Sequence, residues 1–165
     1  MAVFPAFTAA VELRPTMEFK VHIPFVKMLG MRLERMAAGE AEIHLDLREE
    51  LTNSWGVAHG GVTMTLLDVV MAHAARSAET PDAEPLPGVV TIEMKTSFMR
   101  PGVGTLVATG KRLHRSASMA FCEGYVHDTQ GVLLGHASGT FKYMNGLPIP
   151  GENGGKRIHK LNASD

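Results

Sequence analysis

The chain has 165 residues, of which 45% are hydrophobic and 20% are charged, and its formal net charge is −1 at pH 7. This composition is typical of one globular domain, and the mixed charges exclude a strongly basic nucleic-acid surface or a polybasic membrane patch. No apolar run reaches the ~20 residues that a membrane-spanning helix needs. With Cys122 as its single cysteine, the chain is expected to be cytoplasmic, with no disulfide, nucleic-acid partner or membrane partner.

The first quarter of the chain predicts little regular structure before a pair of strands. Gly30 should stop a short helical turn, and the Ala38-Gly39 pair should turn the chain between two strands, of which the second alternates apolar and polar residues. In chain order the pattern predicts an arm over residues 1–24, a helical turn over 25–29, and strands over 31–36 and 40–47.

The segment from Asn53 to Gly61 is polar and rich in glycine, and it runs directly into a long apolar segment that predicts a helix over residues 59–78. The free N–H groups at the start of such a helix favour a ligand with negative charge, and paired glycines let that ligand approach the backbone. Apolar residues occupy nearly every side of the helix, so we expect it to be buried. Its carboxylate, Asp68, is costly to bury and is therefore a candidate functional group.

The second half of the chain predicts four strands. A proline-rich loop over residues 79–87 comes first, and the strands are expected over 89–99, 104–114, 118–128 and 132–144. Alternation in the first of them places Ile92, Met94 and Phe98 on one face and Thr91 on the other. Residues 145–165 predict a disordered tail. Together the elements predict an α+β fold in which one antiparallel sheet wraps around one long central helix.

This order of elements, together with a motif at the start of the long helix, resembles the hotdog-fold acyl-CoA thioesterases of the phenylacetate-pathway (PaaI-like) type. The family pattern is an Asn, then His-Gly-Gly six residues later, then an Asp nine residues after that His. Asn53, the run His59-Gly60-Gly61 and Asp68 fit this pattern. The resemblance covers residues 25–144, which we expect to form the hotdog domain.

The resemblance implies an enzyme that hydrolyses an acyl-CoA thioester to a carboxylic acid and free coenzyme A, with no cofactor and no metal. By this resemblance the backbone N–H of Gly60 binds the thioester carbonyl oxygen, and Asp68 attacks the thioester or activates water. Asn53 points into the site, Thr91 helps to hold the water, and His59 helps to orient the substrate.

Four further residues are candidates for substrate binding: Gly61, Trp55, Arg115 and Ser116. Trp55 could line the acyl pocket or anchor the core, and the core is the favoured interpretation. In the family a Gly-Lys or Gly-Arg pair often precedes strand 118–128, whereas this chain has Ser116-Ala117 there. Whether Arg115 contacts the phosphates of coenzyme A instead is therefore open.

Helix geometry separates the two reacting groups. His59 and Asp68 are nine residues apart, which is about half a turn out of phase and roughly 13 Å along the helix axis. One protomer cannot easily bring Asp68 to its own Gly60 amide. We therefore expect a two-fold homodimer in which each site combines Gly60 of one subunit with Asp68 of the other. The resemblance further implies a dimer of dimers.

Each motif residue also has a purely structural interpretation. His59 could simply cap the helix, Asp68 could be a hydrogen-bonded structural acid, and Asn53 and Thr91 could be ordinary turn and strand residues. Two other functions stay open, a hotdog acyl-thioester dehydratase and a non-catalytic acyl-CoA sensor. The sequence does not choose among aromatic, medium-chain and long-chain acyl groups.

Overall fold

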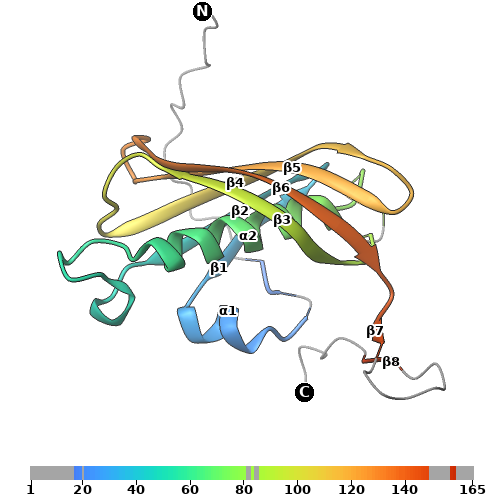
Figure 1. The fold of residues 1–165 in the computed structure, drawn as a ribbon, viewed down its shortest axis with the longest axis horizontal. Helices are drawn as coiled ribbons and strands as arrows, with labels where there is room; N and C mark the ends of the chain where they lie inside the picture. Colours follow the sequence, from blue (N-terminus) through green and yellow to red (C-terminus); the bar gives the residue numbers. More distant parts are fainter. Residues whose placement is uncertain (1–16, 20, 81–82, 84–85, 149–156, 159–165) are drawn as a thin grey trace, which may run out of the picture.

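The computed structural model describes residues 17–19, 21–80, 83, 86–148 and 157–158, and it shows a curved sheet around one long helix (Figure 1). The elements are α1 (Pro24–Leu29), β1 (Arg32–Ala37), β2 (Glu40–Asp46), the 3-10 helix η1 (Glu49–Leu51), α2 (Gly60–Arg76), β3 (Gly88–Phe98), β4 (Thr105–Arg115), β5 (Met119–His127), β6 (Leu133–Met144), β7 (Leu147–Pro148) and β8 (Arg157–Ile158). The α+β fold is confirmed, and each strand of the main sheet begins and ends within one residue of its predicted bounds.

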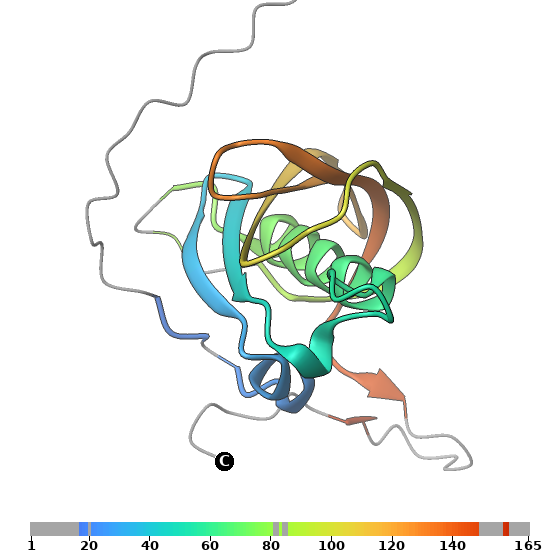
Figure 2. The ribbon, with the colours of Figure 1, turned by 90° about the vertical axis from the view of Figure 1, so that its left-hand side faces the viewer.

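Six strands form one antiparallel sheet in the order β1-β2-β4-β5-β6-β3. The sheet curls around α2, which is seen at a slant within the curve of the strands in Figure 2. β3 follows α2 in the chain but joins the sheet beside β6, at the edge opposite β1. Within the described residues, no strand pairs with the outer edge of β3. That edge therefore carries backbone groups that another strand could bind.

α2 lies directly on a row of small residues in the sheet. Gly110 of β4 is paired with Gly124 of β5, which is paired in turn with Ala137 of β6. A Cβ added to Gly110 would lie 2.6 Å from the carbonyl oxygen of Val70, and one added to Gly124 would lie 2.9 Å from Cγ of Met71. The absent side chains let the helix backbone approach the sheet. The core then fills the space on both sides of this row, with Ile43, Leu45, Leu66, Leu67, Leu106, Val126 and Phe141 fully buried.

The C-terminal end of α2 is held by a buried arginine. The Arg112 guanidinium donates hydrogen bonds to the carbonyl oxygens of Ala75, at 2.9 Å, and Ser77, at 3.1 Å. It also forms an ion pair with Glu79 at 2.8 Å. A cation at this position satisfies carbonyl groups that the helix leaves unpaired and interacts favourably with its negative end.

One side of α2 is not covered by the chain's own sheet. Met64 is 40% exposed, and Asp68, Val69 and Ala72 are only partly buried. The prediction that this helix is buried on every side is therefore wrong for the single chain. The uncovered face is largely apolar and lies next to β3, whose Thr91 is hydrogen-bonded to Asp68.

β3 contains a bulge that the alternating pattern did not predict. Thr91 is paired with Phe141 and Glu93 with Thr140, so the register shifts at Ile92, which is 55% exposed. A bulge adds one residue to a strand and moves the following side chains to the other face. The predicted alternation is thus wrong here, because Thr91 and the core-packed Met94 both lie on the helix side.

The two ends of the chain are described only in part. Residues 1–16 of the predicted arm lie outside the described residues, and the Met17 amide donates a hydrogen bond to the Leu33 carbonyl at 2.9 Å. In the predicted disordered tail, β7 and β8 form a short antiparallel ladder. Residues 149–156 and 159–165 lie outside the described residues, so the tail as a whole stays a prediction.

Candidate active site

The hydrogen bonds around the start of α2 leave one of its two glycine amides available. The His59 amide donates to the Leu51 carbonyl at 3.0 Å, and the His59 ring accepts at Nδ1 from the Gly61 amide at 3.0 Å. Since Nδ1 accepts, a neutral His59 carries its proton on Nε2. Among the described residues, none accepts a hydrogen bond from the Gly60 amide. Gly61, a predicted substrate-binding residue, thus has its amide occupied, whereas Gly60 presents a free donor at the positive end of the helix.

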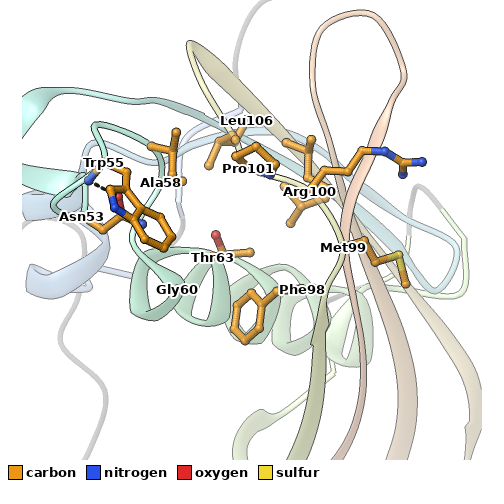
Figure 3. Close-up of a pocket in the computed structure, with 14 residues that line it drawn as sticks. Asn53, Trp55, Ala58, Gly60, Thr63, Phe98, Met99, Arg100, Pro101 and Leu106 are labelled. Carbon is orange, nitrogen blue, oxygen red and sulfur yellow. Dashed lines mark hydrogen bonds between the residues drawn. The ribbon is translucent and has the colours of Figure 1, made fainter.

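A pocket of ≈ 470 Å³ opens at this end of α2 (Figure 3). Gly60 lines it, and three groups of residues form most of the rest of its wall. The preceding loop provides Asn53, Trp55, Val57 and Ala58, and the end of β3 with the segment after it provides Phe98 to Gly102. The inner face of the sheet provides Leu106, Val126 and Leu134. The ring of Phe98 lies alongside Gly60, at 3.6 Å from the position of an added Cβ. The free amide therefore belongs to a mainly apolar cavity, where a hydrogen bond is stronger than in water.

Both predicted loop residues line this pocket. The side-chain Oδ1 of Asn53 accepts a hydrogen bond from the Trp55 amide at 2.9 Å, so Asn53 stabilises the turn as well as lining the pocket. Its carboxamide nitrogen has no hydrogen-bond partner among the described residues. Trp55 is 85% exposed and stands at the rim of the pocket (Figure 3). The interpretation of Trp55 as an anchor of the core is therefore wrong.

Asp68 lies eight residues beyond Gly60, beside β3 rather than in the pocket. The Thr91 hydroxyl donates a hydrogen bond to Asp68 Oδ1 at 2.7 Å. Burial raises the pKa of Asp68 above its ordinary value, and the bond from Thr91 opposes this rise because it favours the carboxylate. The structure therefore brings these two predicted residues together, about 12 Å along the axis from Gly60.

The two predicted hairpin residues lie away from the pocket. Arg115 forms an ion pair with Glu79 at 3.0 Å. The Ser116 hydroxyl accepts a hydrogen bond from the Met119 amide at 3.1 Å, so Ser116 stabilises the hairpin turn. Arg115 lies on the same cross-strand row as Thr91, with β5 and β6 between them. Three strand spacings correspond to about 14 Å. Arg115 can thus reach only a distant part of a long substrate that is bound at Asp68.

The described part of the chain offers no metal site and no reactive cysteine as a second catalytic centre. No cluster of three or more His, Cys, Asp or Glu side chains that could hold a metal is found among the described residues. Cys122 is buried, and this burial raises the pKa of its thiol to about 12, which makes it a poor nucleophile. None of the helices in the described residues is both long enough and apolar enough to cross a bilayer.

Comparison with known proteins agrees with this architecture. The family model described as the thioesterase superfamily matches residues 56–134, which include Gly60, Asp68 and Thr91. A solved structure of a conserved protein from Pseudomonas aeruginosa matches with a TM-score of 0.67 at 26% identity, over 76% of this chain and 97% of that chain. The chain has the hotdog fold of the thioesterase superfamily.

Named relatives of this hotdog protein point to thioesters in general. The medium/long-chain acyl-CoA thioesterase YigI of Escherichia coli K12 is 27% identical over 140 residues, which span 78% of this chain and 89% of YigI. The structure of the PaaI protein from the E. coli phenylacetic acid degradation operon matches with a TM-score of 0.66 at 22% identity, over 73% of this chain and 83% of that chain, a likeness of fold alone. The relatives thus support a thioesterase-superfamily hotdog protein without singling out the phenylacetate-pathway type.

Sequence reasoning missed several residues of the hotdog pocket. Thr63 and Phe98 line it, as does the segment Met99–Gly102. The Arg-Pro-Gly run after β3 indicated in the sequence only that the strand ends there. In the structure the Ala58 amide donates a hydrogen bond to the Gly102 carbonyl at 2.9 Å. That bond fixes the exit segment against the start of α2. Only the fold shows this, because the two segments lie more than 40 residues apart in the sequence.

Proposed function

We propose that the protein is an acyl-CoA thioesterase that hydrolyses an acyl-CoA thioester to a carboxylic acid and free coenzyme A. The unpaired Gly60 amide, at the positive end of α2 and in an apolar pocket, carries this proposal. Thioester hydrolysis passes through a tetrahedral oxyanion, and one preorganised donor aimed at that oxygen supplies about 3–4 kcal/mol. The acyl-CoA thioesterase activity named for the relative YigI supports the same reaction class.

In this proposal Asp68 completes the site from a neighbouring subunit. On the edge strand β3, Thr91 marks the position of Asp68, and Phe98 marks the position of Gly60. If two β3 edges pair antiparallel about a two-fold axis at Lys95, Thr91 lies opposite the partner's Phe98, because the bulge at Ile92 leaves three ladder steps on each side of Lys95. The partner's Asp68 then approaches the Gly60 amide, and both the free edge and the uncovered face of α2 are buried.

The proposed chemistry needs only groups of the chain and water. The Asp68 carboxylate either attacks the thioester carbon or removes a proton from a water that attacks it. The carbonyl oxygen becomes an oxyanion that accepts the Gly60 N–H. The C–S bond then breaks, and the coenzyme A sulfur leaves and takes up a proton. If water attacked, the carboxylic acid is released at this step. If Asp68 attacked, an anhydride with Asp68 is left, and water hydrolyses it to release the carboxylic acid and restore the carboxylate. Thr91 orients the carboxylate, and the Nε2–H of His59 is available to the substrate.

The direct test removes the amide proton of Gly60. Proline suits the first position of a helix, and the backbone of His59, at φ −63° and ψ 137°, is a conformation that tolerates a following proline. The Gly60→Pro variant should therefore fold and lose about 100- to 1,000-fold in kcat, measured as release of free thiol. The control Gly60→Ala keeps the N–H, and its Cβ would meet Phe98 at an ordinary 3.6 Å.

Two results would contradict this proposal. If Gly60→Pro hydrolyses thioesters as fast as Gly60→Ala, the amide does not bind the oxyanion. If the wild-type protein releases no thiol from acetyl-, hexanoyl-, palmitoyl- and phenylacetyl-CoA, the protein is not a general acyl-CoA thioesterase, and a sensor of acyl-CoA becomes the better hypothesis.

A further inference from the structure

We infer that Thr63 selects the acyl group, and that its hydroxyl binds an oxygen substituent on the acyl chain. The favoured substrates are then acyl-CoA thioesters with a hydroxyl or keto group on the chain. This inference rests on the proposed thioesterase function and adds the class of acyl group to it. Thr63 lies three residues after Gly60 on α2, so both residues are on the same side of the helix.

The position of the Thr63 side chain supports this role. Its exposed fraction is 8%, and it lines the pocket at the start of α2. Figure 3 shows its hydroxyl oxygen pointing into the pocket. The methyl group faces the sheet, since Cγ2 lies 3.5 Å from the position of a Cβ added to Gly135. The methyl thus packs against β6 and leaves the hydroxyl for the contents of the pocket.

The hydroxyl of Thr63 has no hydrogen-bond partner among the described residues. A threonine in a helix can bond to the carbonyl four residues earlier, as Thr65 does to Gly61 at 2.9 Å. A hydroxyl that is shut off from water without a partner is destabilising. Since the Thr63 hydroxyl faces the pocket, its partner must be a molecule in the pocket, either water or the substrate.

The apolar residues in the rest of the pocket wall allow the Thr63 hydroxyl to distinguish substituted from unsubstituted acyl chains. Leu106, Val126 and Leu134 present apolar side chains near it. Carbon atoms of an acyl chain pack against these residues, and Thr63 provides a polar contact among them. Three helical residues correspond to about 4.5 Å along the axis, so the substituent should lie near carbons 3 to 5 of the chain. An unsubstituted chain in this position displaces water from Thr63 and leaves the hydroxyl unpaired.

The test compares hexanoyl-CoA with 3-, 4- and 5-hydroxyhexanoyl-CoA by free-thiol release. The wild type should hydrolyse at least one hydroxy thioester with a kcat/KM about 10-fold above that of hexanoyl-CoA, as one hydrogen bond of about 1.4 kcal/mol predicts. Thr63→Val keeps the shape of the side chain and should lose this preference. Thr63→Ser keeps the hydroxyl and should retain the preference. Thr65→Val, which removes a hydroxyl of α2 that is bonded within the helix, is the matched control and should also retain it.

The outcomes separate this inference from the thioesterase proposal. If wild type and Thr63→Val hydrolyse hexanoyl-CoA and show the same ratio of hydroxy to unsubstituted substrate, Thr63 does not select the acyl group, although the protein is a thioesterase. If the wild type hydrolyses none of the four thioesters but does hydrolyse acetyl-, palmitoyl- or phenylacetyl-CoA, this inference fails and the thioesterase function stands. If it hydrolyses none of these substrates either, the thioesterase function itself fails. A preference that Thr63→Val abolishes and Thr63→Ser keeps supports the inference.

Discussion

Burial gives Asp68 two opposite effects, one on catalysis and one on folding. It raises the pKa of the carboxyl group, which makes the carboxylate a stronger base. A raised pKa also means that Asp68 binds its carboxyl proton more tightly in the folded protein than in the unfolded chain. The contribution of Asp68 to stability therefore decreases as the pH rises from the ordinary carboxyl pKa through the raised value. At neutral pH the ionised group is a cost to the fold.

The variant Asp68→Asn should separate these two effects. It should lose at least ~100-fold in kcat because the reacting group is gone. At neutral pH it should melt at a higher temperature than the wild type, and this gain should shrink as the pH falls through the carboxyl range. Melting curves from about pH 4 to pH 8 and thiol release measure both effects. A variant that hydrolyses normally, or that is less stable than the wild type at neutral pH, contradicts this interpretation of Asp68.

The bond from Thr91 should be visible in the pH dependence of the reaction. Thr91→Val removes a donor that favours the carboxylate, so the pKa of Asp68 should rise further. The acid limb of the kcat profile should then move to higher pH, with a smaller change in kcat on the plateau. Thr140→Val is a matched control, because the Thr140 hydroxyl of β6 also donates a hydrogen bond to a carboxylate, that of Glu93 on β3, at 3.2 Å. An unshifted acid limb in Thr91→Val would show that this bond does not tune Asp68.

Among the elements, the contact between α2 and the sheet should be sensitive to a single methyl group. In Gly110→Ala the added Cβ would lie 2.6 Å from the backbone oxygen of Val70, so the helix itself must move. We expect a loss of about 1–3 kcal/mol in the free energy of unfolding, measured with urea. Ser138→Ala, on the exposed face of β6, should change it by less than about 0.5 kcal/mol. Equal unfolding midpoints for the two variants would exclude a tight fit of helix on sheet.

Local patterns predicted the strands and α2 well, because alternation and turn residues report directly on neighbours in the chain. They failed at Ile92, since a bulge depends on the register with β6 and not on the residues of β3 alone. They also failed on α2, because apolar residues such as Met64 look the same in a sequence whether their own sheet or another molecule covers them.

The same distinction applies to the candidate site. The Gly60 amide and Asp68 could be predicted because the helix start and the helix spacing are local features. The pocket could not, because Thr63, Phe98 and Leu134 meet there from three elements that are far apart in the sequence. Trp55 was misjudged for a similar reason, since the residues around it in the sequence do not show that its loop lies at the rim.

For the whole molecule, one chain holds two incomplete halves of the proposed site. The free amide lies with the pocket, and the carboxylate lies with β3, about 12 Å along α2. In the proposed dimer, pairing of two β3 edges would join each half to the complementary half of the other subunit. The protein should therefore be at least a dimer in solution. Dissociation of the dimer into monomers should abolish the hydrolysis of thioesters. A monomer of full activity, observed by light scattering at the assay concentration, would exclude the shared site.

The most direct measurement is the activity of mixed dimers of Gly60→Pro and Asp68→Asn. Each homodimer lacks one half of both sites and should be nearly inactive. A dimer with one subunit of each kind has one site with neither change, where the Gly60 amide of the Asp68→Asn subunit meets the Asp68 of its partner. After the two variants are refolded together in equal amounts, thiol release should recover to roughly a quarter of the wild-type rate, since half of the dimers are mixed and each holds one of two sites. Two different affinity tags verify that mixed dimers form. If mixed dimers form and the activity stays at the level of the two parents, the amide and the carboxylate do not act together across the subunits.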